Sequence, residues 1–173
     1  MDLASIVRRF AQARIAIVGD FFLDQYFVIE PSMDEPSVET GLPAHQVVSM
    51  RHSPGAAGTV ANNLSALDAA EIHAIGIIGD DGHGFILRRE LQKRRVRTDA
   101  LVAASDRFTP TYTKPMFLQA GQEVEGERID VINRTPTPRD LEDLVIGHIQ
   151  AIVAKVDAVV VLDQVTMPDV GVV

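Results

Sequence analysis

The most informative stretch of the sequence is Ser53-Pro54-Gly55-Ala56-Ala57-Gly58-Thr59-Val60-Ala61-Asn62-Asn63-Leu64. Small residues fill its first half, and from Val60 onward apolar residues recur at helical spacing. Small side chains let a backbone approach another group closely, and a helix N-terminus presents unpaired N–H groups. We therefore predict a loop that leads into a helix, with Thr59 as the N-cap. Such a loop either holds a hydroxylated or anionic small molecule or packs tightly against a sheet.

Outward from this stretch, apolar strands alternate with amphipathic helices. Buried strands are predicted at residues 14–20, 72–78 and 158–162, the last being the clearest. Helices are predicted at residues 2–13, 85–95 and 140–154. This alternation predicts a parallel α/β sheet with right-handed crossovers. Two further strand pairs are expected, formed by residues 26–29 with 46–50 and by residues 109–117 with 124–132, and the first pair is expected outside that sheet.

Acidic residues follow the ends of the predicted strands. Two apolar strands stop at an acid, Asp20 and Asp163, and Asp24 follows shortly after the first. Ligands of open α/β sheets collect at the carboxyl ends of the strands. We interpret Asp24 as a functional residue and Asp20 as a structural one. Asp81, after the strand at 72–78, is expected to cap the next helix and not to bind Mg²⁺.

The composition limits the classes of function. The 173 residues carry a net charge of -8 and no cysteine, and 46% of them are hydrophobic. A chain of this length is enough for one globular domain. The absence of cysteine excludes a disulfide framework and a thiolate zinc site. The acidic balance argues against a nucleic-acid binder, so the basic run in residues 88–95 is expected to be a solvated helix face. No apolar run is long enough to span a bilayer, so we expect a cytoplasmic protein without membrane partners.

Several motifs follow one another in a recognisable order. They are Val18-Gly19-Asp20-x-x-Leu23-Asp24, Pro54-Gly55-Ala56-Ala57-Gly58-Thr59-Val60-Ala61, Gly76-x-x-Gly79-Asp80-Asp81-x-x-Gly84, Thr113-Lys114, Arg128-x-Asp130 and Leu162-Asp163. This series resembles the N-terminal half of the PfkB/ribokinase family of carbohydrate kinases, most of all its heptose-phosphate kinases. The resemblance implies a ribokinase-like three-layer α/β/α fold with a small β lid, here about residues 25–52 and 109–132. Residues 1–173 would then form a single partial domain, the substrate-binding half of such a kinase, truncated at its C-terminal side.

The resemblance also implies roles for individual residues. Contacts to sugar hydroxyls would come from Asp24, Gly55, Ala56 and Thr59. A carboxylate accepts hydrogen bonds from hydroxyls, and small residues let the backbone reach the sugar ring. Lys114 and Arg128 would approach a phosphate on the substrate. Further candidates are Asp20, Asp130 and Asp163. The implied cofactors are ATP and Mg²⁺, and the lid strands would pair with a second copy in a homodimer.

The sequence departs from the family pattern in ways that bear on these roles. Ala56 and Thr59 stand where Gly and Asn are usual, and Asp68 stands where Gly or Ser is usual. Without the Asn amide one sugar contact is lost. The substrate is therefore expected to differ from those of better-known members.

The catalytic part of such kinases has no counterpart in the sequence. In the family a Gly-Ala-Gly-Asp loop stabilises the transferring phosphoryl group and supplies the general base, but no Gly-x-Gly-Asp occurs in these 173 residues. We therefore expect a fragment of a sugar kinase that contains no catalytic residue and is inactive alone. Two alternatives stay open, a sugar-binding module without kinase activity and a nucleotide-binding Rossmann-like domain. The second is disfavoured because residues 55–59 do not follow the first strand directly and lack G-x-G-x-x-G spacing.

Overall fold

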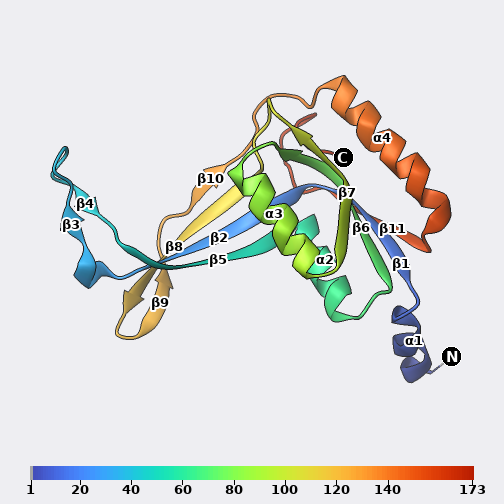
Figure 1. The fold of residues 1–173 in the computed structure, drawn as a ribbon, viewed down its shortest axis with the longest axis horizontal. Coiled ribbons are helices and arrows are strands. Elements are labelled where there is room, and N and C mark those ends of the chain that lie inside the picture. Colours follow the sequence, from blue (N-terminus) through green and yellow to red (C-terminus); the bar gives the residue numbers. More distant parts are fainter. Residues whose placement is uncertain (1) are drawn as a thin grey trace.

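The computed structural model describes residues 2–173 and has an α/β architecture (Figure 1). Its main sheet is parallel throughout, with strand order β11-β1-β6-β7. The strands are β1 (Arg14–Gly19), β6 (Glu71–Gly79), β7 (Val96–Ala104) and β11 (Ala158–Leu162). The prediction of a parallel sheet is therefore confirmed, and it follows from short apolar runs that are separated by helical segments.

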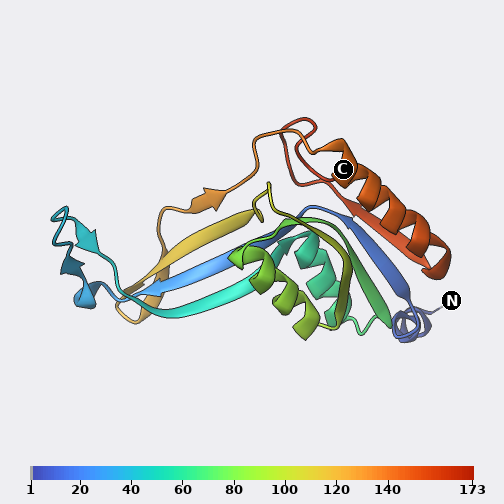
Figure 2. The same cartoon turned by 45° about the horizontal axis from the view of Figure 1, so that its top comes forward.

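Helices cover both faces of this sheet. They are α2 (Ala57–Ala66), α3 (Gly82–Lys93) and α4 (Arg139–Ile152). Helix α1 (Leu3–Phe10) precedes β1, and short 3₁₀ turns lie at Pro31–Met33 and Val153–Lys155. Figures 1 and 2 show α2 and α3 together on one face and α4 on the other. Side chains alternate along each strand, so Ile17 packs with Leu87 of α3 whereas Ala16 packs with Val145 of α4. The expected three-layer arrangement is confirmed.

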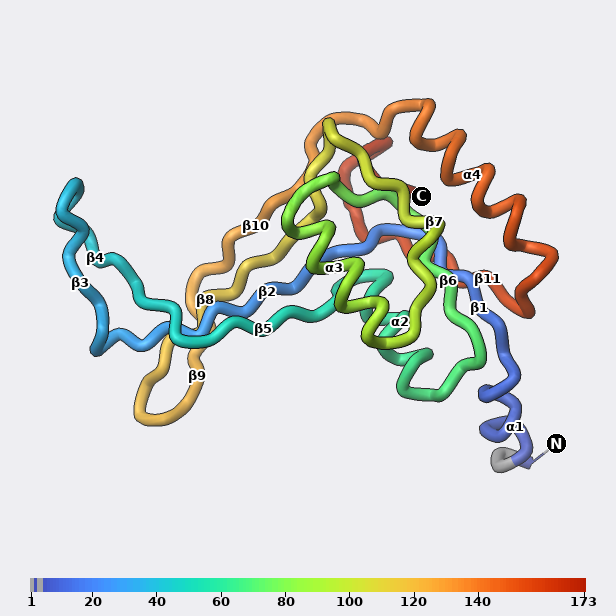
Figure 3. Tube along the Cα trace, viewed as in Figure 1, coloured from blue at the N-terminus to red at the C-terminus, as the bar shows by residue number. Residues whose placement is uncertain are grey.

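A second sheet extends away from the main one (Figures 1 and 3). Its strands are β2 (Phe21–Ile29), β5 (Val47–Ala56), β8 (Thr111–Gln119), β9 (Gln122–Glu125) and β10 (Ile129–Val131). The order is β10-β8-β2-β5, and β9 pairs with β8. At the far end of this sheet, the short strands β3 (Glu35–Pro36) and β4 (Pro43–Ala44) form a protruding arm. Both expected strand pairs thus lie outside the main sheet, and β2 and β8 join them by parallel pairing.

The two sheets meet where β1 passes into β2. Gly19 ends β1 against the carbonyl of Leu162 on β11, and a Cβ at this position would collide with that carbonyl. One residue later, the Asp20 N–H donates to the same Leu162 carbonyl at 3.3 Å, and the Asp20 carbonyl accepts from Ala57 N at 3.0 Å. The junction therefore fixes the start of α2 beside the carboxyl end of β1.

The small-residue stretch differs from its prediction. Residues 53–56 are not a loop, because they continue β5 and pair with Phe21–Asp24 of β2. Helix α2 begins at Ala57 with Ala56 as its N-cap, so the prediction of Thr59 as the cap is wrong. The backbone of Ala56 turns sharply, at φ 51° and ψ −119°, to pass from strand to helix. Such a turn was invisible in the sequence because Ala does not favour it.

Burial also differs from the prediction at several positions. Strand β11 was expected to be buried, but Val159 and Val161 are 39% and 59% exposed because β11 is an edge strand and α4 packs over β6 and β7. Phe85 of α3 and Leu144 of α4 fall within the predicted helices, but they are 68% and 52% exposed. Asp81 does cap α3, since its carboxylate accepts from Gly84 N at 2.7 Å. Among residues 2–173, none of the helices combines the length and the hydropathy needed to cross a bilayer.

Candidate functional site

One face of the second sheet gathers most of the predicted site residues. Because side chains alternate along a strand, Asp24 and Tyr26 of β2 point to the same side. The register places Tyr112 opposite Asp24 and Lys114 opposite Tyr26, and on the other side it places Arg51 of β5 opposite Tyr26. The reverse face carries Phe21 and Leu23, which are buried with residues of α2 and α3. The Asp24 side is therefore the face that α2 and α3 leave uncovered.

Asp24 and Lys114 form the centre of this face. The Lys114 ammonium lies 3.1 Å from Asp24 Oδ1, and the two side chains are only 20% and 18% exposed for Asp24 and Lys114 respectively. The same ammonium donates to the Tyr26 hydroxyl at 3.3 Å. Burial works against the charge on Lys114, but the hydrogen bonds to Asp24 and Tyr26 outweigh it and raise the lysine pKa above its ordinary value. Lys114 is thus a fixed positive charge next to a carboxylate.

The other oxygen of Asp24 points toward Gly55. A Cβ at Gly55 would lie 2.8 Å from Asp24 Oδ2, closer than real Cβ contacts come. Within the described chain no hydrogen bond reaches Oδ2, whereas Oδ1 is engaged by Lys114. The absent side chain of Gly55 therefore lets the Asp24 carboxylate lie close against the β5 backbone, with Oδ2 as its unpaired acceptor.

Arg128 and Asp130 lie at the β10 edge of the same face. The Arg128 guanidinium stacks over Tyr112 at 4.0 Å from the ring centroid, and it makes a bidentate pair with Asp130 at 2.6 and 2.7 Å. The hydrogen bond to Asp130 is the main reason that the pKa of Arg128 is raised. The structure thus brings together Asp24, Gly55, Lys114 and Asp130 from four strands, together with Arg128, the residue before β10.

Three other predicted residues lie apart from this cluster. Asp20 is 4% exposed, and its carboxylate accepts from the backbone N–H groups of Gln164, Val165 and Val172 at 2.9, 3.1 and 2.9 Å. It anchors the chain that follows β11, as its structural interpretation predicts. Thr59 and Asp163 are exposed, and among residues 2–173 neither donates or accepts a side-chain hydrogen bond within the Asp24 cluster. Their roles in binding stay predictions.

A pocket of about 180 Å³ adjoins the face at the carboxyl end of β1. Phe22 and Tyr112, whose rings meet edge to face at 5.2 Å, separate it from Asp24. The buried Arg107 also lines this pocket and donates to the carbonyls of Thr135, Pro136 and Val170, and burial lowers the pKa of this arginine. Arg107 and Asp20 thus fix segments of the pocket lining through backbone groups.

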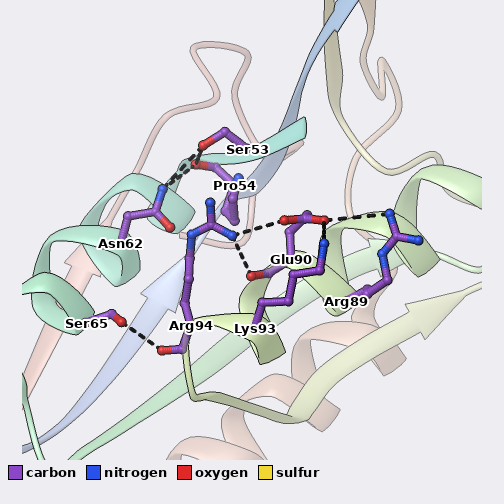
Figure 4. A network of polar contacts seen from close by, with 8 residues as sticks. All are labelled: Ser53, Pro54, Asn62, Ser65, Arg89, Glu90, Lys93 and Arg94. Atoms are coloured by element: carbon purple, nitrogen blue, oxygen red, sulfur yellow. Dashed lines mark hydrogen bonds and ion pairs between the residues drawn. The ribbon is translucent and has the colours of Figure 1, made fainter. Parts of the chain in front are cut away.

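A polar network supports the strand end that carries Gly55 (Figure 4). Asn62 of α2 donates to the Pro54 carbonyl at 3.2 Å. On α3, Glu90 is 7% exposed and pairs with Lys93 at 2.7 Å and Arg94 at 3.2 Å. Ser65 of α2 donates to the Arg94 carbonyl at 2.9 Å, which ties the two helices together. The basic run of α3 is therefore only partly the solvated face that was predicted.

Sequence reasoning missed Tyr26, Arg51 and Tyr112. Tyr26 lies two residues after Asp24, and Tyr112 lies two residues before Lys114, so the period of a strand places each on the face of its neighbour. That signal was present in the sequence. The pairing of β2 with β8, which brings the two sets together, was not.

Within the part of the chain that the structure describes, no metal site accompanies the cluster. Across residues 2–173, no group of three or more His, Cys, Asp or Glu side chains is arranged to hold an ion. The acids of the face are instead paired with Lys114, Arg51 or Arg128. These residues therefore do not fit an Mg²⁺ ligand set.

Comparison with known proteins identifies relatives of the chain. It is 34% identical over 154 residues to the bifunctional protein HldE of Gluconacetobacter diazotrophicus, which covers 89% of the chain and 30% of that protein. It is also 34% identical over 136 residues to the D-beta-D-heptose 7-phosphate kinase of Bordetella bronchiseptica, covering 79% of the chain and 41% of that kinase. The chain thus spans less than half the length of these relatives. No protein-family model matches it.

Among solved structures, the chain is similar to a carbohydrate kinase from Agrobacterium tumefaciens, with a TM-score of 0.60 and 19% identity. The match covers 86% of the chain and 45% of that kinase. The expected ribokinase-like fold and the resemblance to PfkB/ribokinase carbohydrate kinases are confirmed by these relatives.

Proposed function

We propose that this chain, a homologue of HldE proteins and heptose 7-phosphate kinases, forms the sugar-binding part of an ATP-dependent carbohydrate kinase. The acceptor is a sugar or a sugar phosphate. The observation that carries the proposal is the pairing of Asp24 Oδ1 with Lys114, which leaves Asp24 Oδ2 beside Gly55 as an acceptor. A carboxylate oxygen for hydroxyls and a fixed ammonium for an anion are the two groups that recognition of a sugar phosphate requires.

Each residue of the face has a role in this proposal. Asp24 Oδ2 accepts from a sugar hydroxyl above Gly55, while Lys114 turns its remaining N–H groups toward the substrate phosphate. Arg128, held over Tyr112, adds a second cation at the β10 edge. The wall formed by Phe22 and Tyr112 gives the sugar ring an apolar surface next to these polar groups.

ATP and Mg²⁺ are part of the proposal for the whole kinase. ATP supplies the phosphoryl group, and a metal ion neutralises charge on the phosphates in such transfers. The acids of this face are paired with cations and do not fit a metal site, so we assign no catalytic step to them. The residues of this chain bind and orient the acceptor sugar.

Calorimetric titration of the chain with a heptose 7-phosphate tests the proposal. Binding is expected, and it is expected to weaken in Asp24→Asn and Lys114→Met but not in the control Lys155→Met, an exposed lysine in the 3₁₀ turn that follows α4. Absence of binding to any sugar or sugar phosphate would refute the proposal. No ADP release is expected when ATP is added, because these 173 residues lack a Gly-x-Gly-Asp loop, and ADP release would contradict a role in binding alone.

We further propose that the second sheet pairs two copies of the chain. Apolar side chains lie exposed on its strands, including Val48 and Met50 of β5 at 48% and 61% and Ile129 of β10 at 63%. A second copy would cover them. Light scattering is expected to give twice the chain mass of 18.8 kDa, and a mass of 18.8 kDa at all concentrations would refute the dimer.

A further inference from the structure

We propose that Tyr26 is a positioning residue that holds Lys114 in place for the anionic group of the substrate. The proposal rests on the proposed binding of a sugar phosphate. Tyr26 is not one of the groups assigned to the sugar or to its phosphate, and it acts through Lys114.

The contacts of Tyr26 with Lys114 come from the pairing of β2 with β8. The register places the two residues opposite each other, although they are far apart in the sequence. The Lys114 ammonium lies 3.3 Å from the Tyr26 hydroxyl and 4.8 Å from the centroid of its ring. A lysine ammonium is carried on a flexible stem of four carbons, so without such contacts it would sample many positions. Here the tyrosine restricts the ammonium through both its hydroxyl and its ring.

This restriction matters because the other partner of Lys114 has a second task. Asp24 binds Lys114 through Oδ1. In the proposed function the same carboxylate also accepts hydrogen bonds from the sugar hydroxyls. When a ligand changes the position of Asp24, the hydroxyl of Tyr26 still holds the ammonium. The cation therefore stays at the face while the carboxylate adjusts.

The second tyrosine of the chain shows the same arrangement. Only two tyrosines occur in the sequence, and both lie on this face. Tyr112 carries the Arg128 guanidinium at 4.0 Å, and Tyr26 carries Lys114 on its ring with Arg51 at 5.6 Å. The repeated use of tyrosine under a cation supports a positioning role and not a packing role alone.

The test measures the affinities of the wild-type chain and of Tyr26→Phe for two matched ligands, a heptose 7-phosphate and the unphosphorylated heptose. Loss of one hydrogen bond to Lys114 is expected to weaken the affinity for the phosphate by about 2- to 12-fold. The affinity for the neutral sugar is expected to stay unchanged. Tyr26→Leu, which also removes the ring, is expected to lose more affinity for the phosphate. The Lys114 pKa, followed by the NMR signal of its ε-carbon, is expected to fall in Tyr26→Phe.

The outcomes separate this inference from the proposed function. If the wild-type chain binds neither ligand, the proposed function fails and the role of Tyr26 fails with it. If the wild-type chain binds the phosphate and Tyr26→Phe binds it equally well, only the positioning role is overturned. An equal loss for both ligands, with an unchanged Lys114 pKa, would also overturn it, because that result indicates a general defect in the sheet.

Discussion

Ala56 adopts a backbone conformation that L-amino acids avoid, and replacing it by glycine should stabilise the protein. Its φ of 51° and ψ of −119° lie where the Cβ clashes with the backbone. The geometry is imposed from both sides, because Ala56 pairs with Phe21 in the sheet while Ala57 N already donates to the Asp20 carbonyl. The chain therefore cannot relax at this position without breaking the junction between β5 and α2.

The size of the effect follows from two opposing terms. A residue held in such a conformation costs about 1 to 3 kcal/mol. Glycine removes that strain but gains conformational freedom in the unfolded chain, which costs about 0.4 to 1 kcal/mol. Ala56→Gly is therefore expected to raise the free energy of unfolding by about 0.5 to 2 kcal/mol. For a chain of this length the melting temperature should rise by about 1 to 8 °C.

Urea unfolding followed by circular dichroism measures this change. Ala66→Gly is the matched control, since the same atoms are removed at the end of the same helix in a position without positive φ. That variant is expected to lose up to about 1 kcal/mol. If Ala56→Gly were no more stable than the wild type, the backbone strain at Ala56 would be refuted.

Three further changes test other parts of the structure. Gly55→Ala places a methyl group 2.8 Å from Asp24 Oδ2 and should displace that carboxylate. Binding of a heptose 7-phosphate should weaken by about 10- to 150-fold, which corresponds to the loss of one hydrogen bond to a charged group. Gly147→Ala, which has open space around it, is the control and should leave the calorimetric affinity unchanged. Asp20→Asn leaves one acceptor for three backbone donors and should lower the free energy of unfolding by about 2 to 4 kcal/mol in urea; a loss below the error of that measurement would contradict the anchoring role. Burial disfavours the charge of Glu90, but the ion pairs with Lys93 and Arg94 outweigh it and lower the pKa of Glu90 overall. Its contribution to the free energy of unfolding is therefore fully present above the pKa of the unfolded chain, about 4.3, and disappears as the pH falls through the lower pKa of the folded protein. Glu90→Gln should therefore be less stable than the wild type at pH 7, and the difference should shrink toward pH 3; a constant difference would contradict the ion-pair account.

The parts of the fold that could be predicted from the sequence are those set by local pattern. The apolar run at Arg14–Gly19 was recognisable as a buried strand, and Asp81 was recognisable as a helix cap. Burial of β11 was not predictable, because the apolar run at 158–162 is the same whether its strand lies at the edge or the centre of a sheet. The strained turn at Ala56 was hidden for a related reason. Neighbours in the sheet impose it, and the residue itself gives no sign of it.

The candidate site was likewise predictable only in part from the sequence. Asp24, Gly55 and Lys114 were each expected to bind substrate because of the ordered motifs, but their mutual contacts depend on long-range strand pairing. Asp68, at a position where the resemblance leads us to expect Gly or Ser, has a φ of 56°. Aspartate tolerates this left-handed conformation better than most residues. Asp68 therefore adopts its turn at low cost, whereas Ala56 stores strain.

The pairing of Asp24 with Lys114 also indicates how the face would select a ligand. In the free protein each charge compensates the other while both are mostly buried. An inorganic phosphate that drew Lys114 away would leave Asp24 without its cation and close to a second anion. A neutral sugar would donate to Asp24 Oδ2 without using Lys114 at all. Only a ligand that offers hydroxyls to Asp24 and an anion to Lys114 at the same time compensates both charges, so a sugar phosphate should bind more tightly than the sum of its separate parts predicts.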